Sequence, residues 1–221
     1  MNNKDINIIK KTPLFSGMEE DEIEHMLGCL SAVGRNYRKN ETILYPGDPI
    51  NSIGMVISGR VLILKEDFWG NRNIINEALH GDVFAEGYAC TQGVELGISA
   101  VAAEDSRVMF MEVRRVITTC STACAYHVRL VRNLLSVLAR KNLLMDEKLT
   151  HLTQRTTREK LLSYLSSESK RQVSASFEIP YNRQQLADYL SVDRSAMSSE
   201  LSRMRDEGII SFEKNRFRLL I

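Results

Sequence analysis

Hydrogen-bonding side chains gather near the C-terminus of this chain. Arg194, Ser195, Ser198 and Ser199 follow Asp193 in a stretch whose apolar residues recur at helical spacing. A guanidinium group can donate two hydrogen bonds to a guanine, and small hydroxyl side chains let a helix approach base edges closely. We therefore expect a helix that reads bases in a DNA groove through these four residues. The plainer alternative is an ordinary helical hairpin.

A second set of polar residues suits the DNA backbone. Main-chain N–H groups and a cation at the start of a helix can bind a phosphate and set the register of docking. The expected phosphate contacts are Asn182, Arg183, Gln184, Arg203 and Lys214.

Two short helices joined by a tight turn must position these side chains. Asn182 can cap the first helix and Asp193 the second, and Gly208 can end the second. The residues at core spacing are Leu186, Ala187 and Leu190 in the first helix and Met197, Leu201 and Met204 in the second. This pattern is typical of a helix-turn-helix.

Strand-forming runs follow and precede the two helices. Residues 209–212 and 217–221 predict a β-hairpin wing, and residues 177–179 can add a third strand. The pair Thr156 and Glu159 predicts a capping box that opens an earlier helix. We therefore expect a winged helix-turn-helix domain over residues 156–221.

The charge of the chain is unevenly distributed. The 221 residues are 43% apolar and 26% charged, which suits two compact domains. Residues 1–122 carry 12 Lys or Arg against 17 Asp or Glu, a net charge of −5, whereas residues 123–221 carry 17 against 11, a net charge of +6. The positive half contains the predicted helix-turn-helix, in keeping with a nucleic-acid partner.

Long apolar segments are missing from the sequence. No run approaches the roughly 18 apolar residues of a membrane span, and nothing resembles a secretory signal. We expect a cytoplasmic protein that does not enter membranes, with its four cysteines as free thiols.

Between residues 43 and 113 the sequence predicts short strands separated by glycine-bearing turns. One expected hairpin joins residues 55–57 to 61–64, and another joins 98–102 to 108–111. We therefore expect an α+β protein whose residues 1–122 form a β-roll. An enzyme built on a cupin-like roll would show clustered His and Glu ligands, but His80 and Glu86 are isolated, so we expect no enzyme.

Residues 124–152 predict one long helix with a seam of mostly apolar residues at alternating spacings of three and four. Such a seam supports a parallel two-stranded coiled coil, in which Asn142 would pair with its counterpart and fix the register. The seam comprises Leu135, Leu138, Asn142, Met145, Leu149 and Leu152. Residues 123–155 are thus expected to be a dimerisation helix and hinge; the alternative is a helix buried in its own domain.

Taken in order, these segments resemble the CRP/FNR family of bacterial transcription regulators. The resemblance covers nearly the whole chain and rests on residues 13–15 before the first helix, 46–48, 57–61, 81–86 and 182–204. It implies a cyclic-nucleotide-binding-like β-roll (jelly roll), a long dimerisation helix and a winged helix-turn-helix. It also implies a homodimer that reads an inverted-repeat operator in double-stranded DNA and acts on RNA polymerase.

The same resemblance bears on the effector. Members that bind cyclic AMP hold it with a Gly-Glu pair and clamp its phosphate with an Arg-Ser pair. The counterparts here are Ala85-Glu86 and Leu96-Gly97, with Met145 on the long helix near the base. Without the arginine, a buried phosphate would face Glu86 with no cation beside it, at a cost of several kcal/mol. We therefore expect an unidentified effector other than cyclic AMP.

A cysteine-based sensor is the alternative within the same family. Cys120 and Cys124 are four residues apart, so on a helix both thiols would lie on one face. Together with Cys90 they could hold a metal, an iron-sulfur cluster or a redox disulfide. The plainer interpretation is three small buried hydrophobic residues. Haem ranks below this, because the four histidines form no recognisable ligand pair.

Overall fold

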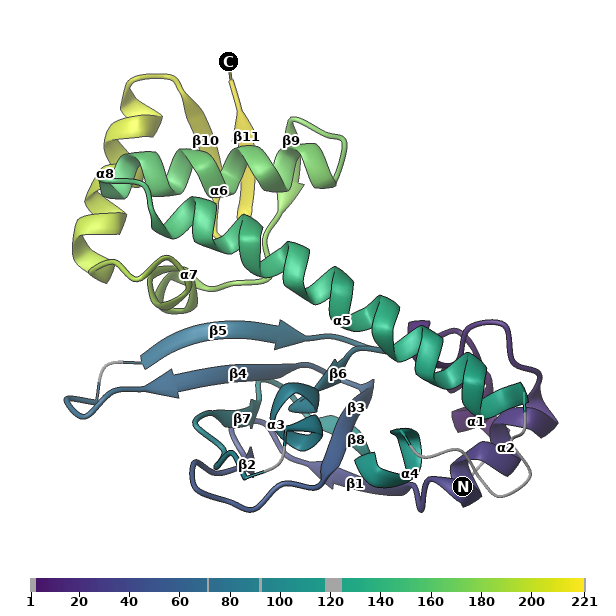
Figure 1. Ribbon diagram of the computed structural model, residues 1–221. Helices are drawn as coiled ribbons and strands as arrows, with labels where there is room; N and C mark the ends of the chain where they lie inside the picture. The colour runs from purple at the N-terminus through teal and green to yellow at the C-terminus, as the bar shows by residue number, and fades with distance from the viewer. Residues whose placement is uncertain (1–2, 71, 92, 118–124, 221) are drawn as a thin grey trace. The chain divides into compact units, whose positions relative to one another are not determined.

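The computed structural model describes residues 3–70, 72–91, 93–117 and 125–220 (Figure 1). The chain divides into two compact units, residues 1–140 and 141–221. Helix α5 (Ala125–Leu152), the longest of the described helices, contributes its first part to one unit and its last part to the other.

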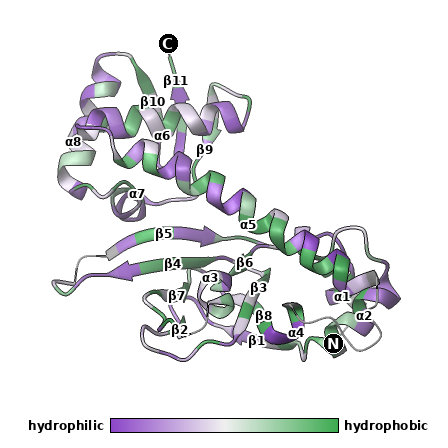
Figure 2. Ribbon diagram, viewed as in Figure 1, coloured by the Kyte–Doolittle hydropathy of each residue, from purple (hydrophilic) through white to green (hydrophobic). Residues whose placement is uncertain are grey.

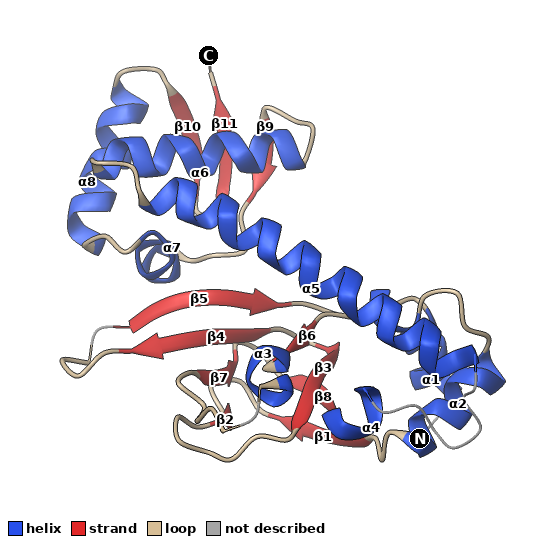
Figure 3. Cartoon of the chain, viewed as in Figure 1, coloured by secondary structure: helices blue, strands red, loops and turns tan. Residues whose placement is uncertain are grey.

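Two four-stranded sheets form the body of the first unit (Figure 3). All strand pairs described in them are antiparallel. One sheet has the order β1 (Val33–Tyr37), β8 (Ser106–Glu112), β3 (Ser52–Ser58) and β6 (Val83–Phe84); the other has the order β2 (Thr42–Leu44), β7 (Ser99–Ala102), β4 (Val61–Glu66) and β5 (Arg72–Ala78).

The core of this unit lies between the two sheets. Val56 and Val108 come from one sheet and Val61, Ala100 and Ala102 from the other, and all five are completely buried in one cluster. Because side chains alternate along each strand, each sheet turns one apolar face inward. This confirms the predicted β-roll.

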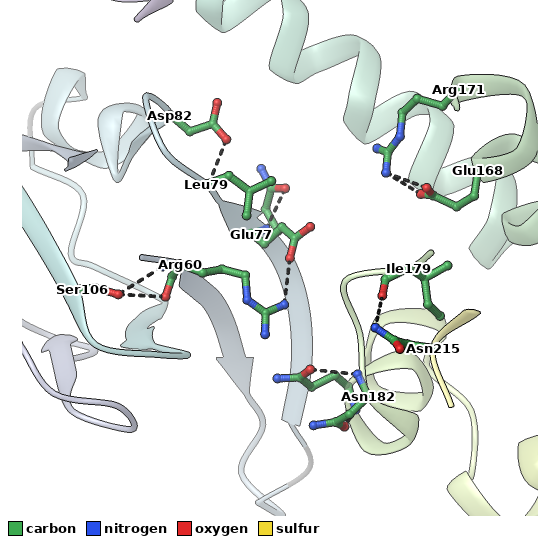
Figure 4. Close-up of polar contacts among 12 residues, drawn as sticks. Arg60, Glu77, Leu79, Asp82, Ser106, Glu168, Arg171, Ile179, Asn182 and Asn215 are labelled. Carbon is green, nitrogen blue, oxygen red and sulfur yellow. Dashed lines mark hydrogen bonds and ion pairs between the residues drawn. The ribbon is translucent and has the colours of Figure 1, made fainter. Parts of the chain in front are cut away.

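Both hairpins predicted within the roll are wrong. Strands β3 and β4 lie in different sheets, as do β7 and β8. Gly59 adopts φ +83° between β3 and β4, and a Cβ atom there would overlap Ser106. The Arg60 N–H donates to the Ser106 Oγ at 3.1 Å, so this turn carries the chain from one sheet to the other (Figure 4). Strands β3 and β4 are both apolar because they face the same core from different sheets. In sequence, two such neighbouring strands look the same as the two strands of a hairpin.

Short helices accompany the strands of the first unit. They are α1 (Asn3–Lys10), the short 3-10 helix η1 (Pro13–Phe15), α2 (Glu20–Cys29), α3 (Glu86–Cys90) and α4 (Val113–Ile117). The expectation that residues 13–15 precede the first helix is wrong, because α1 comes before them. Asp5 of α1 is buried and forms a bidentate ion pair with Arg107 of β8, at 2.6 and 2.9 Å.

The first half of α5 is anchored on the roll unit. Leu130 and Leu134 are buried in the cluster that contains Leu14 and Phe15. The Asn133 Nδ2 donates hydrogen bonds to the Leu14 and Ser16 carbonyls at 3.0 and 2.9 Å. These polar contacts satisfy carbonyl groups around η1 and fix the start of α5.

The second unit combines the end of α5 with three helices and a three-stranded sheet. Its elements are α6 (Thr157–Arg171), β9 (Ser176–Glu178), α7 (Arg183–Leu190), α8 (Arg194–Asp206), β10 (Ile210–Glu213) and β11 (Arg216–Leu219). The sheet has the order β10-β11-β9 and is antiparallel, which confirms the predicted hairpin and its third strand. The predicted capping box is also present, because the Glu159 N–H donates to the Thr156 Oγ1 at 3.2 Å.

No helix among the described residues is long and apolar enough to cross a membrane.

Candidate DNA interface and effector domain

Side-chain caps fix the start of both helices of the helix-turn-helix. The Asn182 Oδ1 accepts from the Gln185 N–H at 2.9 Å, and the Gln185 Oε1 accepts from the Asn182 N–H at 3.0 Å (Figure 4). At the start of α8, the Asp193 Oδ1 accepts from the Ala196 N–H at 2.8 Å. Both predicted caps are confirmed, and each satisfies a main-chain donor that the helix itself cannot.

Left-handed residues end the two helices. Ser191 follows α7 with φ +50°, and Gly208 follows α8 with φ +74°. The Ile209 N–H donates to the Met204 carbonyl at 3.0 Å and the Gly208 N–H donates to the Arg205 carbonyl at 2.9 Å. This is the Schellman motif, which glycine favours because it has no Cβ to clash.

Packing holds the two helices together. The six predicted core residues are all completely buried: Leu186, Ala187, Leu190, Met197, Leu201 and Met204. Helix α6 contacts both helices. Its Arg158 forms ion pairs with Glu200 and Glu207 of the α8 region, and its Lys160 Nζ donates to the Leu190 carbonyl at the end of α7 at 3.3 Å.

The four expected base-reading residues lie in the first half of α8. Arg194, Ser195 and Ser199 are exposed, whereas Ser198 is half-buried. Ser195 donates to the carboxylate of Asp193, so its hydroxyl oxygen remains able to accept a hydrogen bond. The helix therefore turns its apolar side to the core and leaves hydroxyl and guanidinium groups outside.

The expected phosphate contacts differ in their surroundings. Lys214 is exposed at the tip of the β10–β11 turn, and Arg203 is exposed with its Nη1 3.7 Å from Glu200. The Gln184 amide donates to Asp188 at 2.8 Å. Arg183 is half-buried, and its guanidinium carbon lies 4.7 and 5.1 Å from the ring centres of Phe212 and Phe217. Burial lowers the pKa of Arg183.

The sequence pattern places Phe212 and Phe217 in the wing strands but does not indicate that both rings lie beside Arg183. Their direct pairing across β10 and β11 is the structural reason that both rings reach one cation. A hairpin register counted outward from the turn at Lys214 and Asn215 would have revealed it.

In the β-roll, the expected effector residues lie at the start of α3 and in the loop that precedes β7. Ala85 caps α3 in a left-handed conformation, φ +63°, and Glu86 is buried with 8% of its surface exposed. Leu96 is packed into the roll core. A Cβ atom at Gly97 would stand 3.3 Å from the Tyr88 hydroxyl. Met145 belongs to the other unit and is 54% exposed, so its part in a pocket stays a prediction.

The expected dimer seam is largely uncovered in the single chain. Leu135, Met145 and Leu149 are 62%, 54% and 56% exposed, and Asn142 is exposed between them. Leu138 and Leu152 are half-buried, and Leu138 packs against the roll-unit core. Figure 2 shows hydrophobic bands recurring along α5.

Of the candidate metal ligands, Cys120 and Cys124 lie outside the described residues. Cys90 is exposed, so the interpretation as a buried hydrophobic residue is wrong for it. Partial burial of the thiol, with a smaller effect of Glu86, raises its pKa and so disfavours the thiolate. In the parts of the chain that the structure describes, no three His, Cys, Asp or Glu side chains are grouped to hold a metal ion.

Comparison with known families and proteins matches both units. Residues 34–122 match the cyclic nucleotide-binding domain, and residues 159–221 match the Crp-like helix-turn-helix domain. The chain is 25% identical over 204 residues to the cyclic AMP receptor protein of Thermus thermophilus, covering 91% of this chain and 89% of that protein.

Two further relatives agree. The transcriptional activator protein FnrL of Cereibacter sphaeroides is 24% identical over 197 residues, covering 82% of this chain and 74% of that protein. The solved structure of FixK2 from Bradyrhizobium japonicum is 25% identical with a TM-score of 0.66, covering 85% of this chain and 92% of that chain. With a cyclic nucleotide-binding domain, a long helix and a Crp-like helix-turn-helix in this order, the chain belongs to the CRP/FNR family of DNA-binding transcription regulators.

Proposed function

We propose that the protein is a cytoplasmic homodimer that reads an inverted repeat in double-stranded DNA and controls RNA polymerase, without catalytic activity. In this proposal residues 1–122 bind or sense the effector, 123–155 join the two subunits, and 156–221 bind DNA. The effector is unidentified and is not cyclic AMP.

The exposed start of α8 carries this proposal. Arg194, Ser195 and Ser199 stand in its first two turns with their side chains exposed, while the opposite side of the helix is completely buried. A helix packed in this way can enter the major groove with its first residues against base edges. Hydroxyl groups and one guanidinium are suited to donate and accept hydrogen bonds there.

The exposed seam of α5 supports the dimer. Residues 128, 135, 142 and 149 are seven apart, as are 131, 138, 145 and 152, which is the a and d spacing of a coiled coil. An exposed apolar row on a long helix is unfavourable in water, and burial against a second copy would remove it. Two identical DNA-binding units related by a two-fold axis would read an inverted repeat.

Charge placed on this seam tests the dimer. Leu135→Glu should give monomers in sedimentation and abolish tight binding to operator DNA, because two carboxylates would face each other at the helix interface. Leu143→Glu is the matched control: Leu143 is 68% exposed on the same helix but lies off the seam. Leu138 is a poorer probe since it packs against the roll-unit core. A dimeric Leu135→Glu protein would place the interface elsewhere.

The side chains of the roll argue against cyclic AMP. Leu96 is 1% exposed where cyclic-AMP-binding members have the clamping arginine, and Gly97 is crowded by the Tyr88 hydroxyl where they have the serine. An anion beside the buried Glu86 would meet a like charge without that cation. Calorimetric titration with cyclic AMP should give no saturable heat; a micromolar binding isotherm would overturn this part of the proposal.

Sensing by cysteines is the alternative within the family. The raised pKa of Cys90 makes that thiol a weak ligand and nucleophile, so the alternative depends on Cys120 and Cys124. Protein purified without oxygen would then carry metal, sulfide or a visible absorption band that Cys120→Ser removes. Colourless, metal-free protein whose DNA binding ignores oxidants would favour a small organic ligand in the roll.

A further inference from the structure

Three phenylalanines form a row across the wing sheet. Phe217 of β11 lies directly opposite Phe177 of β9 on one side and Phe212 of β10 on the other. Their ring centres are 6.3 and 5.7 Å apart. Phe177 and Phe217 are buried, and Phe212, at the edge of the row, is half-buried. The row therefore ends in a ring that two guanidinium groups approach, and the guanidinium carbon of Arg205 lies 5.8 Å from its centre, farther than that of Arg183.

Arg183 of α7 covers this end of the row. Its guanidinium carbon lies 4.7 Å from the centre of the Phe212 ring and 5.1 Å from that of Phe217. A cation over an aromatic face is attracted by the ring's electron density, more strongly where the pair is partly shielded from water. Arg183 is the first residue of α7 and directly follows the capping Asn182. The rings thus hold a flexible side chain beside the start of that helix.

The Arg183 guanidinium retains its hydrogen-bonding capacity. Among the described residues, no carboxylate forms an ion pair with Arg183, in contrast to Arg158, Arg171 and Arg203. The cation–π contact uses none of its N–H donors, which lie in the plane of the group. An oriented fork of donors beside the N–H groups of a helix start is suited to one phosphate oxygen pair.

We infer that Phe212 is a positioning residue for DNA binding: it holds the Arg183 guanidinium edge-on to a backbone phosphate and so couples the wing to α7. Phe212 itself touches no DNA in this arrangement. The inference rests on the phosphate contact proposed for Arg183. If the inference holds, the wing raises the affinity for DNA in two ways: through Arg183 of α7 and through its own turn at Lys214.

Two substitutions separate the ring's electronic role from its bulk. Phe212→Leu keeps an apolar side chain and removes the aromatic face, whereas Phe212→Tyr keeps the face. The probe is a duplex recovered from a random-sequence pool by binding to the wild-type full-length protein. Phe212→Leu should bind it about tenfold more weakly. The slope of log affinity against log salt, which is negative, should become shallower by about 0.9, the value of one phosphate contact. Phe212→Tyr should restore both.

A double-mutant cycle with Arg183→Ala decides the mechanism. If Phe212 acts through Arg183, Phe212→Leu should have no further effect in the Arg183→Ala protein. Phe177→Leu, at the far end of the row, is the control and should leave the salt slope unchanged. Thermal unfolding of each variant identifies conditions in which all are folded.

The experiment distinguishes failure of the positioning role of Phe212 from failure of the phosphate contact of Arg183. If Arg183→Ala weakens binding but Phe212→Leu adds an independent loss, the positioning role is wrong and the phosphate contact stands. If Arg183→Ala changes neither affinity nor salt slope while the wild type binds tightly, the phosphate contact is wrong and the positioning role falls with it.

Discussion

Arg194 is the first residue of α8, and its exposed side chain is the only cation in the first two turns of that helix. Loss of a bidentate contact to guanine is worth about 1–3 kcal/mol of discrimination. Arg194→Ala should therefore relax the preference for one base pair when the protein is used in a binding selection. Arg203→Ala, which removes another exposed cation of α8, should weaken binding to all sequences alike. If the Arg194→Ala protein ranks operator variants in the same order as wild type, Arg194 contacts a phosphate and not a base.

The backbone of Val173 adopts a strained conformation. It adopts φ +50° in the turn between α6 and β9, and the residue is 91% exposed. A β-branched residue rarely enters the left-handed region, whereas asparagine tolerates it, and the exposed valine contributes little packing. Val173→Asn should raise the free energy of unfolding by about 1 kcal/mol, measured by urea denaturation. Val173→Ala keeps most of the strain and should gain much less. An Asn variant no more stable than the Ala variant would contradict this account.

At the scale of elements, the end of α5 is joined to α6 and α7 by a cluster of buried polar and aromatic groups. The Lys148 Nζ lies 4.3 Å from the centre of the Tyr189 ring of α7, and the His151 Nδ1 lies 2.7 Å from the Ser163 Oγ of α6. Burial lowers the pKa of Lys148 to about 8 and also lowers that of His151. The titratable groups gathered there are Glu147, Lys148, His151, Tyr164, Glu168, Tyr181 and Tyr189.

The low pKa of Lys148 predicts a pH-dependent stability. Its folded-state pKa of about 8 lies below the ordinary 10.5, so between these values the unfolded chain binds more protons and stability rises with pH. The difference is worth about 3 kcal/mol at pH 7. Lys148→Met should therefore be more stable than wild type at pH 7, by up to about 3 kcal/mol, and this advantage should shrink towards pH 10. A constant advantage from pH 7 to 10 would contradict the burial argument. Thermal unfolding at several pH values measures it.

The elements of the second unit were predictable because local chemistry specifies them. Asn182, Asp193 and Gly208 mark the helix ends, and the helical spacing of apolar residues marks the buried faces. The roll was predictable as a class but not in its pairing, because β3 and β4 are both apolar and adjacent yet lie in different sheets. Strand β1 was missed altogether, since its residues are mostly exposed and show no apolar alternation.

For the candidate DNA interface, the sequence predicts which side chains are exposed but not what surrounds each of them. Exposure of Arg194 and Ser199 follows from the helical pattern alone. The setting of Arg183 does not, because it depends on the register that brings Phe212 and Phe217 together from two strands. Likewise, the left-handed conformation of Ala85 has no local signal, since alanine rarely adopts it.

At the scale of the whole molecule, the proposed effector control would require two arrangements of the proposed dimer that the effector can bias. Helix α5 contributes to both compact units, and its polar contacts to Leu14 and Ser16 fix its first half to the roll. Its last turns are joined to the helix-turn-helix through Lys148 and Tyr189.

Selection of DNA by the wild-type protein tests the central claim most directly. Full-length protein is mixed with a pool of random-sequence duplexes, and the bound fraction is sequenced after several rounds. A homodimer that inserts α8 into the major groove should enrich an inverted repeat whose half-sites are about 10 base pairs apart, centre to centre. Enrichment of a single half-site, of a direct repeat or of no sequence at all would contradict the proposal that two α8 helices read DNA as a symmetric pair.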